Sequence, residues 1–171
     1  MPLMIKLNRN IMKVYLSLDN GHFITVEFNL QEVKVNTLDI TRTFLDKVMS
    51  VKRHAICGTL PRKVRHIYDV TMLFKRDNIQ DFLKDTEKLK YLLKLTKETD
   101  SYYLQKRNIS QEYDPLGAYA FGTWKHYFND EIRRRYETLH EDLLYTHDCQ
   151  NFDNAIKVFE LINQLFSSIG E

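Results

Sequence analysis

Residues 41–74 carry the pattern that most constrains the fold, because it is typical of two helices joined by a tight turn. The first helix is expected to begin near Asp39 or Thr41, either of which can cap it, and apolar residues follow at helical spacing. Gly58 and Pro61 mark the connection, since glycine ends helices and proline fits well in a first turn. The segment therefore predicts a helical hairpin.

Three charged residues break the apolar pattern of this hairpin. The second helix, residues 64–74, is apolar nearly all round and is expected to be buried, yet Asp69 interrupts it and Arg65 lies one turn earlier. Lys47 lies at the margin of the first helix's apolar stripe. Burying a charge is costly unless it is paired or used. One interpretation is an Arg65–Asp69 structural pair with Lys47 reaching water, and the other is a functional site.

The motifs that contain these charges resemble a known family. The run RTFLDK (42–47), followed after a basic turn by RHIYDV (65–70), resembles the C-terminal half of the nucleotidyltransferase toxins of the AbiEii/AbiGii family. The resemblance extends from about Val14 through DPLGAY (114–119) to the end of the chain. It implies catalytic roles for Lys47 and Asp69 and a supporting role for Arg65. Members are usually the toxin of a bacterial toxin–antitoxin or abortive-infection system.

Composition limits the class of protein. The 171 residues are 43% hydrophobic, which is enough to bury a core, and the net charge of +2 is too small to indicate nucleic-acid binding by itself. Cys57 and Cys149 lie far apart without metal-like spacing and fit reduced thiols. No apolar run reaches membrane length and the start lacks a signal-peptide pattern, so a cytoplasmic location without membrane partners is expected.

The N-terminal residues 12–36 have the pattern of strands. A hairpin is predicted at Asn20-Gly21, which supplies the positive φ angles of a tight turn. We therefore predict an α+β chain, in which residues 1–38 are strands completing a nucleotidyltransferase sheet and residues 39–171 are a helical C-terminal domain. Glu27 lies on the polar side of the second strand, where plain solvent exposure and a metal-binding role both remain open.

The metal-binding motif of the family is missing from this chain. The family pattern opens with a Gly-Ser turn followed by two carboxylates that hold divalent ions, whereas the sequence contains neither Gly-Ser nor Gly-Gly. The resemblance thus implies an incomplete nucleotidyltransferase-like fold, from a fragment, an internal start or a degenerate homologue. Mg²⁺ and NTP are expected for the complete enzyme. The chain alone is expected to be inactive and to self-associate through its open sheet.

The rest of the chain is expected to be helical except for one aromatic stretch. Asn78 is expected to cap a helix that continues through residue 98, and two more are expected over residues 129–145 and 152–169. The stretch 99–128 mixes aromatic and basic residues, which either bind nucleic acid or tie a loop to the core. The candidate nucleic-acid contacts are Arg107, Lys125, Arg133 and Arg134.

Two functions are carried forward. The resemblance implies transfer of a nucleotidyl group from NTP to an acceptor, with tRNA as one expected acceptor and with an antitoxin that acts indirectly or at transcription. The alternative is a non-catalytic helical module, derived from the same fold, that binds RNA or a protein. An in-frame Gly-Ser turn with paired carboxylates upstream of Met1 would separate the two in favour of the enzyme.

Overall fold

The computed structural model describes residues 38–105, 112–142 and 150–170. The pattern of contacts between residues divides the chain into two units, Met1–Leu38 and Asp39–Glu171, and the second unit is described here by itself. In the described ranges the regular elements are all helices, and no strand occurs. The predicted helical bundle is confirmed for this part. The predicted strands, and with them Glu27, lie outside the described residues.

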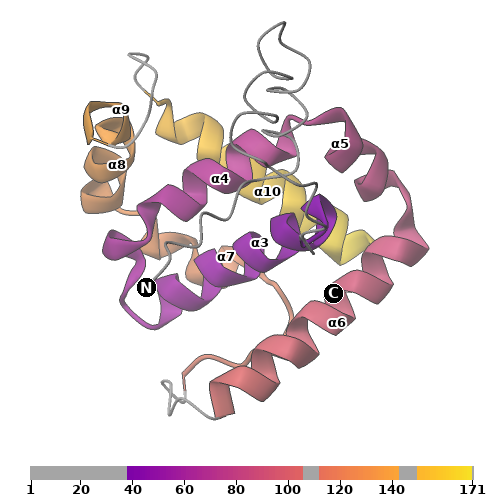
Figure 1. The fold of residues 1–171 in the computed structure, drawn as a ribbon. Coiled ribbons are helices and arrows are strands. Elements are labelled where there is room, and N and C mark those ends of the chain that lie inside the picture. Colours follow the sequence, from indigo (N-terminus) through magenta and orange to yellow (C-terminus); the bar gives the residue numbers. More distant parts are fainter. Residues whose placement is uncertain (1–37, 106–111, 143–149, 171) are drawn as a thin grey trace, which may run out of the picture. The chain divides into compact units, whose positions relative to one another are not determined.

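The predicted hairpin forms from α3 (Ile40–Ile56) and α4 (Val64–Phe74), which lie side by side (Figure 1). Asp39 caps α3, because its Oδ1 accepts a hydrogen bond of 2.9 Å from the backbone N–H of Thr41. Gly58 has a φ of 68° in the connection, a conformation that glycine adopts without strain. Pro61 lies in a separate short 3₁₀-helix, η1 (Leu60–Arg62), so α4 begins after it.

The single helix predicted from Asn78 to residue 98 is wrong, because the structure has two. α5 (Asp77–Lys84) ends at Asp85, and α6 (Thr86–Gln105) begins directly afterwards. Asp85 causes the break, since its Oδ1 accepts a hydrogen bond of 3.1 Å from the backbone N–H of Lys88 and thereby caps the second helix. Asn78 lies inside α5, and Arg76 occupies the N-cap position.

The C-terminal part begins with α7 (Phe121–Trp124) and the 3₁₀-helix η2 (Lys125–Tyr127). The first predicted terminal helix is broken into α8 (Asp130–Glu137) and α9 (Leu139–Asp142), and residues 143–145 lie outside the described ranges. The last helix, α10 (Phe152–Ser168), differs from the prediction by one residue. Asn129 and Asn151 cap α8 and α10 through their side-chain oxygens.

One hydrophobic core joins these helices, and α10 contributes a large part of it. α10 packs against α4, α7 and α8 and lies behind α4 in Figure 1. Aromatic rings fill the space between α7 and α10, and the fully buried members are Tyr119, Phe121, Trp124, Phe152, Phe159 and Phe166. The aromatic residues that the sequence places in 112–128 therefore mainly pack in the core, whereas Tyr102 and Tyr103 on α6 are exposed. No described helix is both long and apolar enough to cross a membrane.

Candidate functional site

Lys47 and Asp69 meet where α3 packs against α4. The Lys47 ammonium donates a hydrogen bond of 2.8 Å to Oδ2 of Asp69, and it lies 2.8 Å from Nδ1 of His66. The Asp69 Oδ2 is 3.6 Å from the same His66 nitrogen, which is too long for a hydrogen bond. The three side chains therefore form one cluster, called here the Lys47 cluster.

The local sequence explains why these charges face one another. Val48 and Phe44 beside Lys47, and Ile67 and Val70 beside Asp69, are fully buried, so helix packing directs both charged side chains to the margin of the α3–α4 interface. There the Lys47 and Asp69 side chains remain 30% and 26% exposed. A pair at this depth keeps part of its hydration and still interacts more strongly than a surface pair.

The electrostatics of the cluster keep Asp69 ionised. Burial alone would raise the pKa of the Asp69 carboxyl, but the hydrogen bond and the opposite charge of Lys47 hold the pKa below its ordinary value of 3.8. An ionised Asp69 is a hydrogen-bond acceptor and a fixed negative charge for Lys47 at neutral pH. Its position against Lys47 fits an orienting role.

A second histidine lies next to the cluster. The ring centroids of His54 and His66 are 6.0 Å apart, and Nδ1 of His54 is 2.7 Å from the Thr59 hydroxyl. Burial, together with the charges of Arg53 and Lys63, lowers the pKa of His54 to about 4. His54 is consequently uncharged at neutral pH and adds a polar but neutral ring beside His66.

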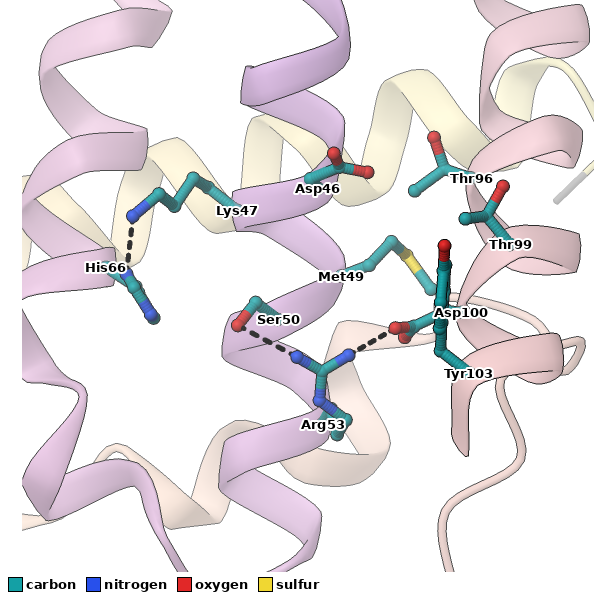
Figure 2. A pocket seen from close by; sticks show the side chains of 10 residues that line it. All are labelled: Asp46, Lys47, Met49, Ser50, Arg53, His66, Thr96, Thr99, Asp100 and Tyr103. Carbon is teal, nitrogen blue, oxygen red and sulfur yellow. Dashed lines mark hydrogen bonds and ion pairs between the residues drawn. The ribbon is translucent and has the colours of Figure 1, made fainter. Parts of the chain in front are cut away.

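A cavity of about 380 Å³ opens between α3 and α6, and Lys47 and His66 are among the residues that line it. Figure 2 shows Lys47 reaching from α3 toward His66, while Arg53 extends between Ser50 and Asp100. Arg53 forms an ion pair with Asp100, whose other oxygen accepts a hydrogen bond of 3.2 Å from the Tyr113 hydroxyl. The cavity thus has a polar lining, in which α3 contributes both cations and the Asp46 carboxylate, and α6 contributes Asp100.

Arg65 lies elsewhere. It is exposed and lines a different cavity, with Arg62 and Arg135, so the structure does not bring it to Asp69. The structural pair considered for Arg65 and Asp69 is replaced by the contacts of Asp69 with Lys47 and His66. Lys47, which the structural interpretation expected to reach water, is partly exposed, but its ammonium contacts Asp69 and His66.

Two of the four candidate nucleic-acid residues, Lys125 and Arg133, form ion pairs with carboxylates. Lys125 lies 2.6 Å from Glu160 across η2 and α10, and Arg133 contacts Asp153 at 2.6 Å and Glu137 at 3.4 Å. Arg134 is exposed, and Arg107 lies outside the described residues. Their role as nucleic-acid contacts stays a prediction. The ion pairs of Lys125 and Arg133 are typical of solvated surface charges.

His66 is the member of the cluster that sequence reasoning missed. It precedes Asp69 by three positions, which places both on one face of a helix, so the spacing contained a usable signal. The same reasoning admits Arg65, four positions before Asp69, and periodicity alone does not choose between them. In the structure His66 is the residue that joins Asp69 at Lys47, because that face of α4 packs against α3.

Comparisons with models of protein families, with curated proteins and with solved structures give no match. The case for a function therefore depends on the geometry of the Lys47 cluster and on the motifs that contain it.

Proposed function

We propose that this chain is the C-terminal portion of a nucleotidyltransferase-type toxin of a bacterial toxin–antitoxin or abortive-infection system, and that Lys47 and Asp69 act in its transfer reaction. One observation carries the proposal. The two residues that the AbiEii/AbiGii resemblance singles out are 22 positions apart on different helices, and their charged groups lie 2.8 Å apart. Lys47 also lines a polar cavity, which a purely structural ion pair does not require.

In this proposal Lys47 binds a phosphate group of the NTP. An ammonium group is a compact charge with three donors, and in the cluster two of them are directed to Asp69 and His66, which leaves one for a phosphate oxygen. Asp69 and His66 hold the ammonium in place, so that its charge is already positioned when negative charge develops on the transferring group. Asp69 is thus a positioning residue for Lys47.

The described residues do not provide a site for a divalent ion. No group of three or more His, Cys, Asp or Glu side chains suited to a metal occurs among them, and the one carboxylate of the cluster is engaged by Lys47. Glu27, the candidate metal ligand, lies outside the described residues, and its role stays a prediction.

Binding of NTP to the 171-residue chain tests the proposal directly. Isothermal titration calorimetry with ATP, GTP, CTP and UTP should detect binding of at least one nucleotide. Lys47→Ala should weaken it about tenfold to a hundredfold, because a hydrogen bond to a charged group is lost. Asp69→Asn should weaken it less. Lys84→Ala is the control, since Lys84 lies in an exposed pair with Asp81 on α5.

Two outcomes would contradict the proposal. One is that no NTP binds to the native chain, and the other is that Lys47→Ala binds NTP as tightly as the native chain and Lys84→Ala do. If the chain instead binds RNA without any affinity for NTP, the non-catalytic binding module becomes the better explanation. Circular dichroism of each variant shows whether a loss of binding comes from unfolding.

A further inference from the structure

A second cavity, of about 240 Å³, lies between the η1–α4 segment and α8. Three arginines line it, Arg62, Arg65 and Arg135, and we call it the arginine pocket. Its other lining residues are apolar or threonine, and no carboxylate is among them. The three arginines therefore line one concave surface from two different parts of the chain.

The arginine pocket has an excess of positive charge. Arg62 and Arg65 are exposed, and no described carboxylate forms an ion pair with either. Arg135 is paired along α8 with Glu131 at 3.0 Å, which offsets one of the three charges. Lys63 and Arg134 are exposed neighbours in sequence and add to the positive potential. This contrasts with Lys125 and Arg133, whose charges are offset by carboxylates.

The shape and chemistry of the arginine pocket indicate its ligand. Guanidinium groups bind phosphate oxygens with paired, parallel hydrogen bonds, and several arginines around one cavity suit a phosphate better than an isolated carboxylate. The apolar residues Val64 and Leu139 are buried, so they offer little surface to anchor a peptide side chain. No aromatic residue lines the cavity, so it provides no platform on which a base could stack.

We propose that the arginine pocket binds the backbone phosphates of a nucleic-acid strand without regard to base sequence. Phosphate contacts position a strand and carry no sequence information by themselves. Arg65 of the pocket and His66 of the Lys47 cluster are consecutive residues of α4, so a strand held at Arg65 lies beside the helix that carries the candidate site. The inference rests on the proposed function for the strand's role as acceptor, whereas binding itself depends only on the arginine pocket.

Fluorescence anisotropy with a labelled single-stranded RNA, and with DNA of the same sequence, measures this binding in the full chain. Arg62→Ala with Arg65→Ala should weaken binding of both strands about tenfold for each arginine at low salt. It should also reduce the slope of log Kd against log salt by about 1.4, the value for two phosphate contacts on a single strand. The matched control is Lys75→Ala with Arg76→Ala, which removes two exposed charges at the other end of α4.

Several outcomes would overturn the inference. It fails if the Arg62/Arg65 variant and the Lys75/Arg76 variant bind the strands equally, or if the native chain binds neither strand. It also fails if polyglutamate displaces the strand but inorganic pyrophosphate does not, because the pocket would then select an acidic peptide. Pyrophosphate binding that is lost in the Arg62/Arg65 variant, with unchanged strand binding, would assign the pocket to a free phosphate instead.

Two further variants keep the result interpretable. Arg62→Lys with Arg65→Lys retains the charge but not the paired hydrogen bonds, so it should retain most of the salt dependence while binding more weakly than the native chain. Lys47→Ala should weaken NTP binding about tenfold to a hundredfold and keep strand binding. Failure of the arginine pocket and failure of the proposed function therefore give different patterns, and circular dichroism confirms that each variant is folded.

Discussion

The Lys47 ammonium lies 2.8 Å from Nδ1 of His66, and this contact fixes the tautomer of the ring. An ammonium group has only donors, so Nδ1 accepts the hydrogen bond and the ring proton lies on Nε2. Nitrogen-15 chemical shifts of the histidine ring should show the Nε2–H tautomer for His66 in the native chain. In Lys47→Met the ring loses its donor, and the two tautomers should become mixed. An Nδ1–H tautomer in the native chain would contradict this arrangement.

The Lys47–Asp69 pair should contribute measurably to stability. Lys47→Ala and Asp69→Ala should each lower the free energy of unfolding by about 1–2 kcal/mol, since the pair is partly desolvated and each change leaves its partner without the opposite charge. The double-mutant cycle should give a coupling of about 1 kcal/mol. The Lys84–Asp81 pair, whose side chains are 75% and 74% exposed, is the control and should couple by less than about 0.5 kcal/mol. Urea unfolding provides all these values.

Acid should weaken the fold partly through Asp69. Its pKa in the folded chain is below the ordinary value of 3.8, so the ion pair stabilises the fold fully above that value. As the pH falls from 3.8 through the folded pKa, the unfolded chain binds the proton first and this stabilisation is lost. In urea unfolding, the Asp69→Asn variant should be less stable than the native chain at neutral pH. Its free energy of unfolding should also decrease less than that of the native chain as the pH falls through that interval. An equal decrease in the native chain and the variant would contradict the assignment.

His54 should control stability in a higher pH range. Its pKa is about 4 in the folded chain, against an ordinary value of 6.5, so only the unfolded chain is protonated between these values. The free energy of unfolding should therefore decrease as the pH falls from 6.5 to about 4, by about 1–2 kcal/mol once solvent screening of this half-buried ring is allowed for. His54→Gln should remove that decrease. An NMR titration of the His54 ring should give its midpoint near 4.

The sequence predicts the helix limits well where a cap and a clear period coincide. Asp39 begins α3 as expected, and the predicted limits of α10 differ from the observed ones by a single residue. The break at Asp85 was not predicted, because the apolar period continues across it and only the side-chain cap interrupts the helix. Local capping chemistry thus competes with periodicity, and the period alone does not show which prevails.

The candidate site could be predicted from the sequence as a pair of residues but not as a cluster. Lys47 and Asp69 could be singled out because each places a charge beside buried apolar residues and because their motifs resemble those of a family. Whether Arg65 or His66 accompanies Asp69 depends on how α4 is rotated against α3, which is a tertiary property. The cavity between α3 and α6 has the same origin, since it forms only when the two helices are packed.

Lys52 should be the most sensitive lysine of α3 for folding, although it lies outside the candidate site. It is 5% exposed, its ammonium donates a hydrogen bond of 2.6 Å to the Ala118 carbonyl, and it lies 5.8 Å from the centroid of the Tyr113 ring. It therefore links α3 to the irregular segment 112–120, whose aromatic residues belong to the core. The segment is neither helix nor strand, and its other anchors are the buried rings of Tyr113 and Tyr119 and the hydrogen bond from Tyr113 to Asp100.

Lys52→Ala should lower the free energy of unfolding by about 2–4 kcal/mol, because it leaves a cavity beside Tyr113 and removes the donor to the Ala118 carbonyl. Lys52→Met retains most of the side-chain volume but not the donor. It should therefore lower the free energy of unfolding by only about 1–2 kcal/mol, which is less than the decrease for Lys52→Ala. Urea unfolding and hydrogen exchange of the backbone amides in 112–120 measure the two effects separately. Lys47→Ala is the matched control on the same helix and should leave exchange by local opening of 112–120 unchanged. Equal stability of Lys52→Ala and the native chain would show that the segment is held by its aromatic residues alone.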